Sequence, residues 1–430
     1  MKHLYIILLV LPLMGFGQGW EQIFYEFNDN CYVEGAGYSV KQTNDGGYII
    51  TGISDDDETT NKNDDNKMVL IKTDEYGVIQ WYQNFGEDTN GLSDGGFDVI
   101  QTNDDGYVVI GSLLIKTDSN GNVEWINENI GGSGVLQTND GGYIVVSGSF
   151  LVKTDYNGNQ EWINENISGT RIQKTTDGGY IITRETCSCE NYSDCYYDCD
   201  FDVYLIKTNE NGQELWSQTY GGTGNDYGWS VQQTYDGGYI IGGSTYSYGN
   251  SGDLYLLKTD ENGEEIWSQT FGTSNYEDGY DVKQTNDGGF IFVGTKEVVD
   301  NYDDLDVYLI KTNEYGNEIW SQTFGGTGYD IGWSVQQTSD GGYIITGETS
   351  KCEDEQGNIV DCGDECPQIY LIKTDDQGNI SSTIELPTPT SKRELIKTTN
   401  ILGQENTTIK NQPIIEIYDD GSVEKKYIIE

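Results

Sequence analysis

The sequence predicts an all-β fold, a seven-bladed β-propeller of four-stranded antiparallel blades with a short C-terminal β tail. Glycine (56 residues) and tyrosine (32 residues) are abundant, which favours tight turns and strands over helices. An Asp-Gly-Gly turn followed by an apolar run occurs six times, and a seventh copy reads Asp104-Asp105-Gly106. Six tryptophans each follow a second kind of turn, and a seventh, Trp20, precedes all of these turns. Seven repeats of one β unit are typical of a propeller.

Each repeat contains four strand candidates, as the fifth repeat shows at 229–234, 238–242, 254–258 and 266–271. An Asp-Gly-Gly turn joins the first two, because glycine accepts the positive φ of a tight hairpin. A turn that opens with Asp or Asn precedes the fourth candidate in every repeat. We interpret its acids as turn formers rather than calcium ligands, since such side chains bond nearby backbone N–H groups. These residues are Asp74, Asp118, Asp155, Asn209, Asp260, Asn313 and Asp375.

The tryptophan positions predict how the ring closes. Trp20 precedes the first Asp-Gly-Gly turn, and no tryptophan follows Gly378 in the last repeat. Turns and tryptophans therefore match only if the N-terminal strand around Trp20 completes the final blade. Such closure removes the open sheet edges that promote aggregation. The tryptophans are Trp20, Trp81, Trp125, Trp162, Trp216, Trp267 and Trp320.

The two ends of the chain predict export. Residues 1–17 have the pattern of a secretory signal peptide, in which Lys2 precedes an apolar core that ends in small residues. We expect the propeller over 18–385, a Pro-Thr linker over 386–391 and a C-terminal secretion and sorting tail over 392–430. No other stretch approaches transmembrane length, so the mature protein is predicted to be secreted or exposed on the outer-membrane surface.

Two parts of the sequence resemble known families. The segment from Asp260 to Trp267 resembles the tryptophan-docking repeat of quinoprotein-type propellers, with one residue fewer between Asp and Gly. Whole repeats such as 217–243 are similar to those of secreted propeller proteins of Bacteroidetes. The tail, through segments 401–405 and 411–430, resembles the C-terminal targeting domain of type IX secretion system cargo. That resemblance implies the type IX machinery as a partner; the alternative is a small accessory hairpin without a targeting role.

Charge and composition exclude several classes of function. The formal charge is -49, from 72 acidic and 23 basic residues, and such a surface repels nucleic acid. The only histidine, His3, belongs to the signal peptide, which excludes histidine-dependent catalysis and histidine metal centres. Arg393 lies in the tail, so only Arg171 and Arg184 remain and a sialidase-type arginine triad is excluded. For an enzyme only carboxylate chemistry remains, and no pair of acids stands out.

The variable connections share one predicted face of the disc, where we expect recognition. An acid stands five residues before the valine of four innermost strands: Asp94, Asp226, Glu277 and Asp330. An aromatic residue often stands two residues before that valine, and Trp229, Tyr280 and Trp333 form the candidate ligand platform. One interpretation is that the acids hold calcium and the aromatics bind a sugar. The other is that the acids form turns while the aromatics pack between blades.

Eight cysteines in an exported chain predict disulfides. Four in the fourth repeat are expected to form two bridges, in any of three pairings: Cys187, Cys189, Cys195 and Cys199. The seventh repeat has three, and we expect Cys31 to bridge one of Cys352, Cys362 and Cys366. A zinc site on four nearby thiolates is the alternative.

These features favour a secreted or cell-surface binding or adhesion propeller without catalytic residues. Its expected ligand is an extracellular glycan or a surface protein, with calcium as the expected cofactor. A purely structural scaffold and a carboxylate-dependent glycan-active enzyme are the alternatives. Ligand-linked stabilisation without turnover distinguishes a binder from an enzyme, and a scaffold shows neither.

Overall fold

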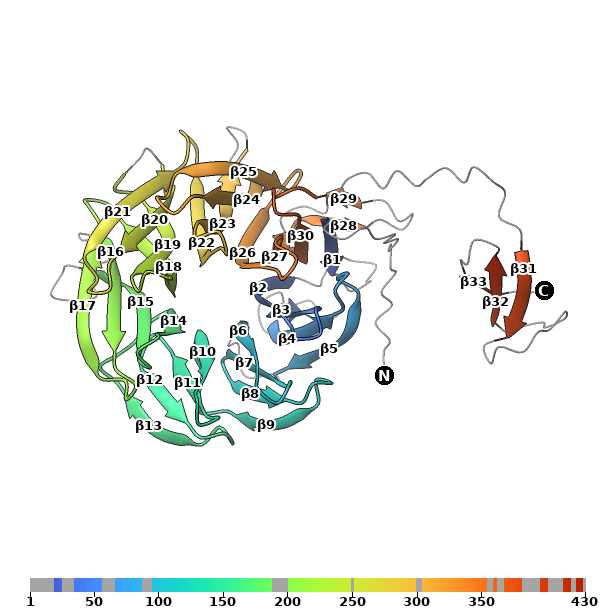
Figure 1. The fold of residues 1–430 in the computed structure, drawn as a ribbon, viewed down its shortest axis with the longest axis horizontal. Coiled ribbons are helices and arrows are strands. Elements are labelled where there is room, and N and C mark those ends of the chain that lie inside the picture. The colour runs from blue at the N-terminus through green and yellow to red at the C-terminus, as the bar shows by residue number, and fades with distance from the viewer. Residues whose placement is uncertain are drawn as a thin grey trace. The chain divides into compact units, whose positions relative to one another are not determined.

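The first of two compact units is a ring of seven four-stranded sheets (Figure 1). This confirms the predicted seven-bladed β-propeller. The units comprise Met1–Ser381 and Ser382–Glu430. The computed structural model describes residues 19–24, 35–55, 66–86, 95–187, 200–248, 251–298, 304–353, 359–361, 367–380, 395–400, 413–418 and 423–427.

Blades 1 to 6 are antiparallel meanders in which the first strand lies innermost and the fourth outermost (Figure 1). Blade 1 comprises β2 (Gly35–Gln42), β3 (Tyr48–Asp55), β4 (Asn66–Thr73) and β5 (Ile79–Phe85). Blade 2 comprises β6 (Gly96–Gln101), β7 (Tyr107–Gly111), β8 (Leu114–Thr117) and β9 (Val123–Asn127). Blade 3 comprises β10 (Gly134–Gln137), β11 (Tyr143–Val146), β12 (Leu151–Thr154) and β13 (Gln160–Asn164).

The next three blades have the same order. Blade 4 comprises β14 (Arg171–Lys174), β15 (Tyr180–Cys187), β16 (Phe201–Thr208) and β17 (Glu214–Tyr220). Blade 5 comprises β18 (Asp226–Gln233), β19 (Tyr239–Thr245), β20 (Asp253–Thr259) and β21 (Glu265–Phe271). Blade 6 comprises β22 (Glu277–Gln284), β23 (Phe290–Glu297), β24 (Leu305–Thr312) and β25 (Glu318–Phe324).

Blade 7 is completed by the N-terminal strand, as the sequence predicts. It comprises β26 (Asp330–Gln337), β27 (Tyr343–Thr349), β30 (Gln368–Thr374) and β1 (Trp20–Phe24). Strand β1 runs antiparallel to β30, and the register joins Trp20 to Lys373 and Phe24 to Ile369. The strands β28 (Lys351–Glu353) and β29 (Ile359–Asp361) form a two-stranded sheet between β27 and β30.

The second unit contains one described sheet. Its strands are β31 (Leu395–Asn400), β32 (Pro413–Tyr418) and β33 (Val423–Tyr427), paired antiparallel in that order.

Each outermost tryptophan covers a turn of the next blade. The turn glycine has a φ between 70° and 83°, and a β-carbon there would lie within 2.8 Å of the indole. Glycine is therefore required both for its backbone conformation and for the space that it leaves. Trp20 closes the ring in the same way, and it also contacts Tyr48 of blade 1 with ring centroids 6.0 Å apart. The tryptophan and glycine pairs are Trp20 and Gly77, Trp81 and Gly121, Trp125 and Gly158, Trp162 and Gly212, Trp216 and Gly263, Trp267 and Gly316, and Trp320 and Gly378.

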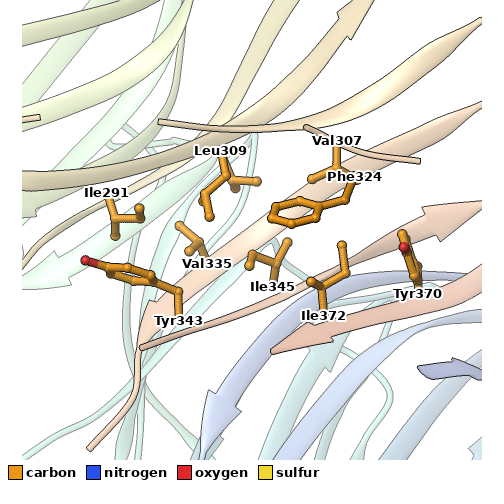
Figure 2. Packing of buried hydrophobic residues seen from close by; sticks show 10 residues of the cluster. Ile291, Val307, Leu309, Phe324, Val335, Tyr343, Ile345, Tyr370 and Ile372 are labelled. Atoms are coloured by element: carbon orange, nitrogen blue, oxygen red, sulfur yellow. The ribbon is translucent and has the colours of Figure 1, made fainter. Parts of the chain in front are cut away.

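The hydrophobic core is divided into layers between neighbouring blades. Seven clusters of buried residues correspond to the seven interfaces. Figure 2 shows the layer between blades 6 and 7, where Val307 and Leu309 point toward Ile345 and Ile372. Each of these side chains is at most 1% exposed, and burial of one such side chain contributes about 1.5–3 kcal/mol.

A buried lysine connects the two turns at one end of every blade. Lys72 is 2% exposed, lies 2.9 Å from Asp45 of the first turn and donates to the carbonyl of Thr73 at 2.7 Å. The same ion pair recurs at 2.9 to 3.1 Å in all seven blades. A buried ammonium needs such partners because its desolvation is costly. The pairs are Lys72 and Asp45, Lys116 and Asp104, Lys153 and Asp140, Lys207 and Asp177, Lys258 and Asp236, Lys311 and Asp287, and Lys373 and Asp340.

We predict that Trp20→Ala destabilises the propeller, because it removes the side chain that joins blade 7 to blade 1. The expected loss of unfolding free energy is about 3 kcal/mol, the lower end of the range for Trp→Ala, since Trp20 is only half-buried. Urea denaturation measures it. Leu215→Ala is the control, because Leu215 lies on an outermost strand and is 56% exposed. Equal stability of the two variants would show that the closing contact contributes nothing.

Candidate functional site

The acids that open the third-to-fourth turns bond their own backbone, as interpreted from the sequence. Asp74 Oδ1 accepts hydrogen bonds from the N–H groups of Tyr76 and Val78, both at 2.9 Å. Asp155 accepts the equivalent bonds from Asn157 and Asn159. Their role in this fold is to shape the turn.

The innermost strands enclose a central cavity of about 180 Å³, which we call the channel cavity. All seven blades contribute residues to its wall, so it lies on the axis of the ring. The wall combines aromatic rings with hydroxyl groups and charged side chains. The charged and aromatic residues are Tyr38, Lys41, Phe97, Asp98, Arg171, Asp281, Lys283 and Trp333.

Two aspartates in the channel cavity connect neighbouring blades. Asp281 of blade 6 accepts hydrogen bonds from Ser230 of blade 5 at 2.6 Å and from Ser334 of blade 7 at 3.3 Å. It also forms an ion pair with Lys283. Burial raises the pKa of Asp281, but the ammonium of Lys283 outweighs this effect and holds the pKa below its usual value. Asp98 does the same for blades 1 and 3, accepting from Ser39 Oγ at 3.0 Å and from the Val135 N–H at 3.2 Å.

Four aromatic rings form a continuous arc at the start of the innermost strands, which we call the mouth arc. Tyr280 and Trp333 are in close contact, with centroids 4.2 Å apart. Trp333 meets Tyr38 edge-on at 5.8 Å, and Tyr38 stacks on Phe97 at 5.9 Å. Phe97 is 37% exposed and the other three are half-buried. Of the predicted platform, Tyr280 and Trp333 therefore lie together, whereas Trp229 stacks on Tyr227 at 5.5 Å.

A buried carboxylate holds the tyrosine end of the mouth arc. Tyr280 and Tyr276 donate their hydroxyls to Asp278 Oδ2 at 3.0 and 2.9 Å. Burial raises the pKa of Asp278 to about 6, although these two hydrogen bonds lower it. Asp278 thereby fixes the orientation of the Tyr280 ring.

The predicted acids on this face are buried at the starts of their strands. Asp226, Glu277 and Asp330 are fully buried. Each accepts hydrogen bonds from the loop that precedes it: Asp226 from Gly222 N at 2.8 Å, Glu277 from Thr273 N at 3.0 Å, and Asp330 from Gly326 N at 3.0 Å. Among the described residues no group of three or more Asp, Glu, His or Cys side chains is arranged to hold a metal, so these acids do not share one ion.

Each of these acids faces a second carboxylate from the preceding blade. A β-carbon on Gly221 would lie 1.9 Å from Asp202 Oδ1 and 2.7 Å from Asp226 Oδ2, so both oxygens occupy the space beside that glycine. The same arrangement recurs at the next two interfaces. The three pairs are Asp202 with Asp226 beside Gly221, Asp253 with Glu277 beside Gly272, and Asp306 with Asp330 beside Gly325.

The pKa values of the paired acids indicate mutual repulsion. Burial, and then the neighbouring Asp226, raises the pKa of Asp202. Burial and Glu277 raise the pKa of Asp253 in the same way. Burial raises the pKa of Asp330 to about 6, with Asp306 adding to the rise, while Thr349 and Lys351 lower it.

Several predicted residues lie outside the described part of the chain. They are Asp94, Cys31, Cys189, Cys195, Cys199, Cys362 and Cys366, together with the expected bridge from Cys31. Cys187, the last residue of β15, is disulfide-bonded. The backbone of Cys352 lies in β28.

Sequence reasoning missed the partner carboxylates and the channel charges. Asp202, Asp253 and Asp306 each stand five residues before the buried lysine of their strand, a repeat that a register alignment reveals. Asp98 and Asp281 occupy the position that serine takes in Ser39, Ser230 and Ser334 of the neighbouring blades, which was a second available signal.

Comparison with known proteins supports the fold. No protein-family model and no curated protein matches the chain. The WD40 domain of Pan2 from Neurospora crassa is similar, with 10% identity and a TM-score of 0.52 over 84% of this chain and 97% of that domain. Virginiamycin B lyase from Staphylococcus aureus has 12% identity and a TM-score of 0.46 over 83% of this chain and 99% of that one. BamB from Moraxella catarrhalis has 12% identity and a TM-score of 0.38 over the same shares.

At these identities the Pan2 likeness shows the fold alone, and the lower scores carry no argument. The chain is a β-propeller protein. Within the described residues there is no helix with the length and apolar character that a membrane crossing requires.

We predict that Asp281→Ala destabilises the ring, because it removes the ion-pair partner of the half-buried Lys283 and releases the serines of blades 5 and 7. Loss of one partner of a buried pair costs about 3–5 kcal/mol, and we expect about 3 kcal/mol because Lys283 is partly exposed. Asp376→Ala, at an exposed turn, is the control. Thermal unfolding measures the difference, and equal melting temperatures of the two variants would contradict a bridging role for Asp281.

Proposed function

We propose that this protein is an exported, non-catalytic binding propeller that takes a glycan-like ligand at the channel mouth. The observation that carries the proposal is the mouth arc, of which Tyr38, Phe97 and Trp333 also line the channel cavity. The arc presents aromatic rings from four blades, and the rest of the cavity wall presents hydroxyls, carboxylates and ammonium groups. Binding sites commonly combine apolar surfaces with a few placed polar groups.

Sugars suit this combination because their C–H faces stack on aromatic rings while their hydroxyls both donate and accept hydrogen bonds. The wall supplies acceptors on Asp98 and Asp281 and donors on Lys41, Lys283 and Arg171. The ion pairs and blade contacts of these groups hold them in place before a ligand arrives. A preorganised site loses less conformational entropy on binding.

Calcium and export complete the proposal. The carboxylates at the blade interfaces offer only oxygen ligands, which hard cations prefer. The pattern of residues 1–17 and the tail that resembles type IX cargo support delivery to the cell surface or the medium, with that machinery as a partner. The acidic charge of -49 argues against nucleic acid as the ligand.

We predict that an array of neutral and acidic oligosaccharides, probed with the full chain in calcium, identifies at least one bound glycan. Trp333→Ala should weaken that binding at least tenfold because it interrupts the mouth arc, whereas Trp333→Phe should retain most of it. Tyr235→Ala is the control, since Tyr235 is 72% exposed on an Asp-Gly-Gly turn away from the arc. Binding that survives Trp333→Ala in a folded variant would place the ligand elsewhere.

Export is tested separately. We predict that a reporter fused to residues 392–430 reaches the surface of cells that contain a working type IX apparatus. The same reporter should remain in the periplasm of cells that lack it. Cell fractionation measures the difference, and periplasmic retention in both strains would reject the sorting role of the tail.

A further inference from the structure

All three carboxylate pairs contain a buried oxygen without a hydrogen-bond partner, and in two of them this oxygen belongs to a fully or nearly fully buried acid. Asp226 is fully buried and Asp253 is 6% exposed, and the Oδ1 atom of each has no hydrogen-bond partner. Asp202 Oδ1 is also buried and unpartnered, and it shares the space beside Gly221 with Asp226 Oδ2, which accepts hydrogen bonds from Gly222 N and Ser247 Oγ. A carboxylate oxygen removed from water without a donor is costly, and a second carboxylate beside it adds repulsion.

The third pair differs because a lysine is near it. Lys351 lowers the pKa of Asp330 and of Asp306, and its side chain lies beside Gly326, whose N–H donates to Asp330. The hydrogen bonds do not distinguish this pair, because both oxygens of Asp330 are bonded as both oxygens of Glu277 are. Asp306 Oδ1 is buried and unpartnered, like Asp253 Oδ1. The interface between blades 6 and 7 thus has a positive charge of its own. Among the described residues no lysine or arginine lowers the pKa of Asp202 or Asp253, which burial and the facing acids raise.

In blade 1 a lysine takes the place of one of the paired carboxylates. Lys67 stands five residues before Lys72, as Asp202 stands five before Lys207, and the two occupy equivalent places opposite Ser54 and Thr186. In the sequence, the following repeat carries the acid Asp94 at the position of Asp226. The chain therefore has a basic residue at that register where blade 2 follows, and aspartate where blades 5, 6 and 7 follow, with Lys351 beside the pair at blade 7.

From this contrast we propose that the blade 4–5 and blade 5–6 interfaces each bind one Ca²⁺ ion. The first site uses Asp202 and Asp226, and the second uses Asp253 and Glu277. This inference deepens the calcium part of the proposed function and rests on it. It goes further by naming two ions, their ligands, and the blades that they join.

The chemistry of the pairs fits calcium better than other metals. All of their side-chain donor atoms are oxygens. Zinc and copper prefer sites with imidazole or thiolate ligands, which these pairs lack. Mg²⁺ demands strict octahedral geometry and gives up water reluctantly, while Ca²⁺ accepts irregular sets of carboxylates, carbonyls and water. Gly221 and Gly272 beside the pairs are exposed, so water and the ion have access. Two carboxylates per ion suit an affinity in the extracellular range, with a Kd of about 10⁻⁴–10⁻³ M.

The test is calcium binding to the full chain without any glycan, by equilibrium dialysis and by thermal unfolding in CaCl₂, MgCl₂ or EDTA. The wild type should bind two calcium ions and gain thermal stability in CaCl₂ but much less in MgCl₂. Asp202→Asn and Asp253→Asn should each remove one ion, and the double variant should bind none. Asp306→Asn is the matched control, because its pair has Lys351, and it should still bind two.

One further variant keeps the proposal falsifiable if the asparagine variants fold poorly. Asp202→Lys gives blade 4 the residue that blade 1 has at the equivalent position, Lys67. Because the lysine replaces carboxylate repulsion with attraction to Asp226, this variant should unfold at a higher temperature than the wild type in EDTA. It should also bind only one calcium ion. No calcium binding by the wild type, or two ions still bound by the double variant, would overturn the proposal. If the protein binds calcium but no glycan, the glycan ligand is rejected and this inference stands. If it binds a glycan but no calcium, only this inference is rejected.

Discussion

The contact between each outermost tryptophan and the glycine turn of the next blade is the constraint on which the ring depends. It fixes the spacing of neighbouring sheets at the rim, where the indole occupies the volume that a β-carbon on the turn would need. Because the rim is fixed, each pair of neighbouring blades packs its apolar layer in the same way. The innermost strands then converge on the axis, which brings Tyr38, Trp333 and Tyr280 together from three different blades.

Many of the basic residues of this acidic protein lie within the blades or on the channel wall. Seven lysines are buried within the blades and Lys41, Lys283 and Arg171 line the channel cavity, so ten of the 23 basic residues serve the interior. Buried acids such as Asp226, Glu277 and Asp330 offset these charges in part, and the exterior is strongly acidic. A dense negative surface keeps copies of the protein apart and favours cations near the carboxylate pairs, an effect that salt screens.

The local parts of the fold could be predicted from the sequence because their signals are local. The Asp-Gly-Gly hairpin, the second turn and the tryptophan lie within short segments, and the displaced Trp20 revealed the closure by counting alone. The buried lysines were missed because a single lysine in a strand looks like a solvent-facing residue. The pair of Asp202 and Asp226 was missed for a different reason: its members come from different blades, and only the packing of sheets brings them together.

The pairing of β1 with β30 has a consequence for how the chain folds. The first strand to be made pairs with one that is made almost last, so blade 7 stays one strand short until residues 368–374 are available. Each earlier blade consists of consecutive strands and can form from local contacts, whereas the last needs a contact of very high sequence separation, which is slow to form. A nascent chain is therefore an open arc, and the ring can close only after the strand at residues 368–374 has been synthesised.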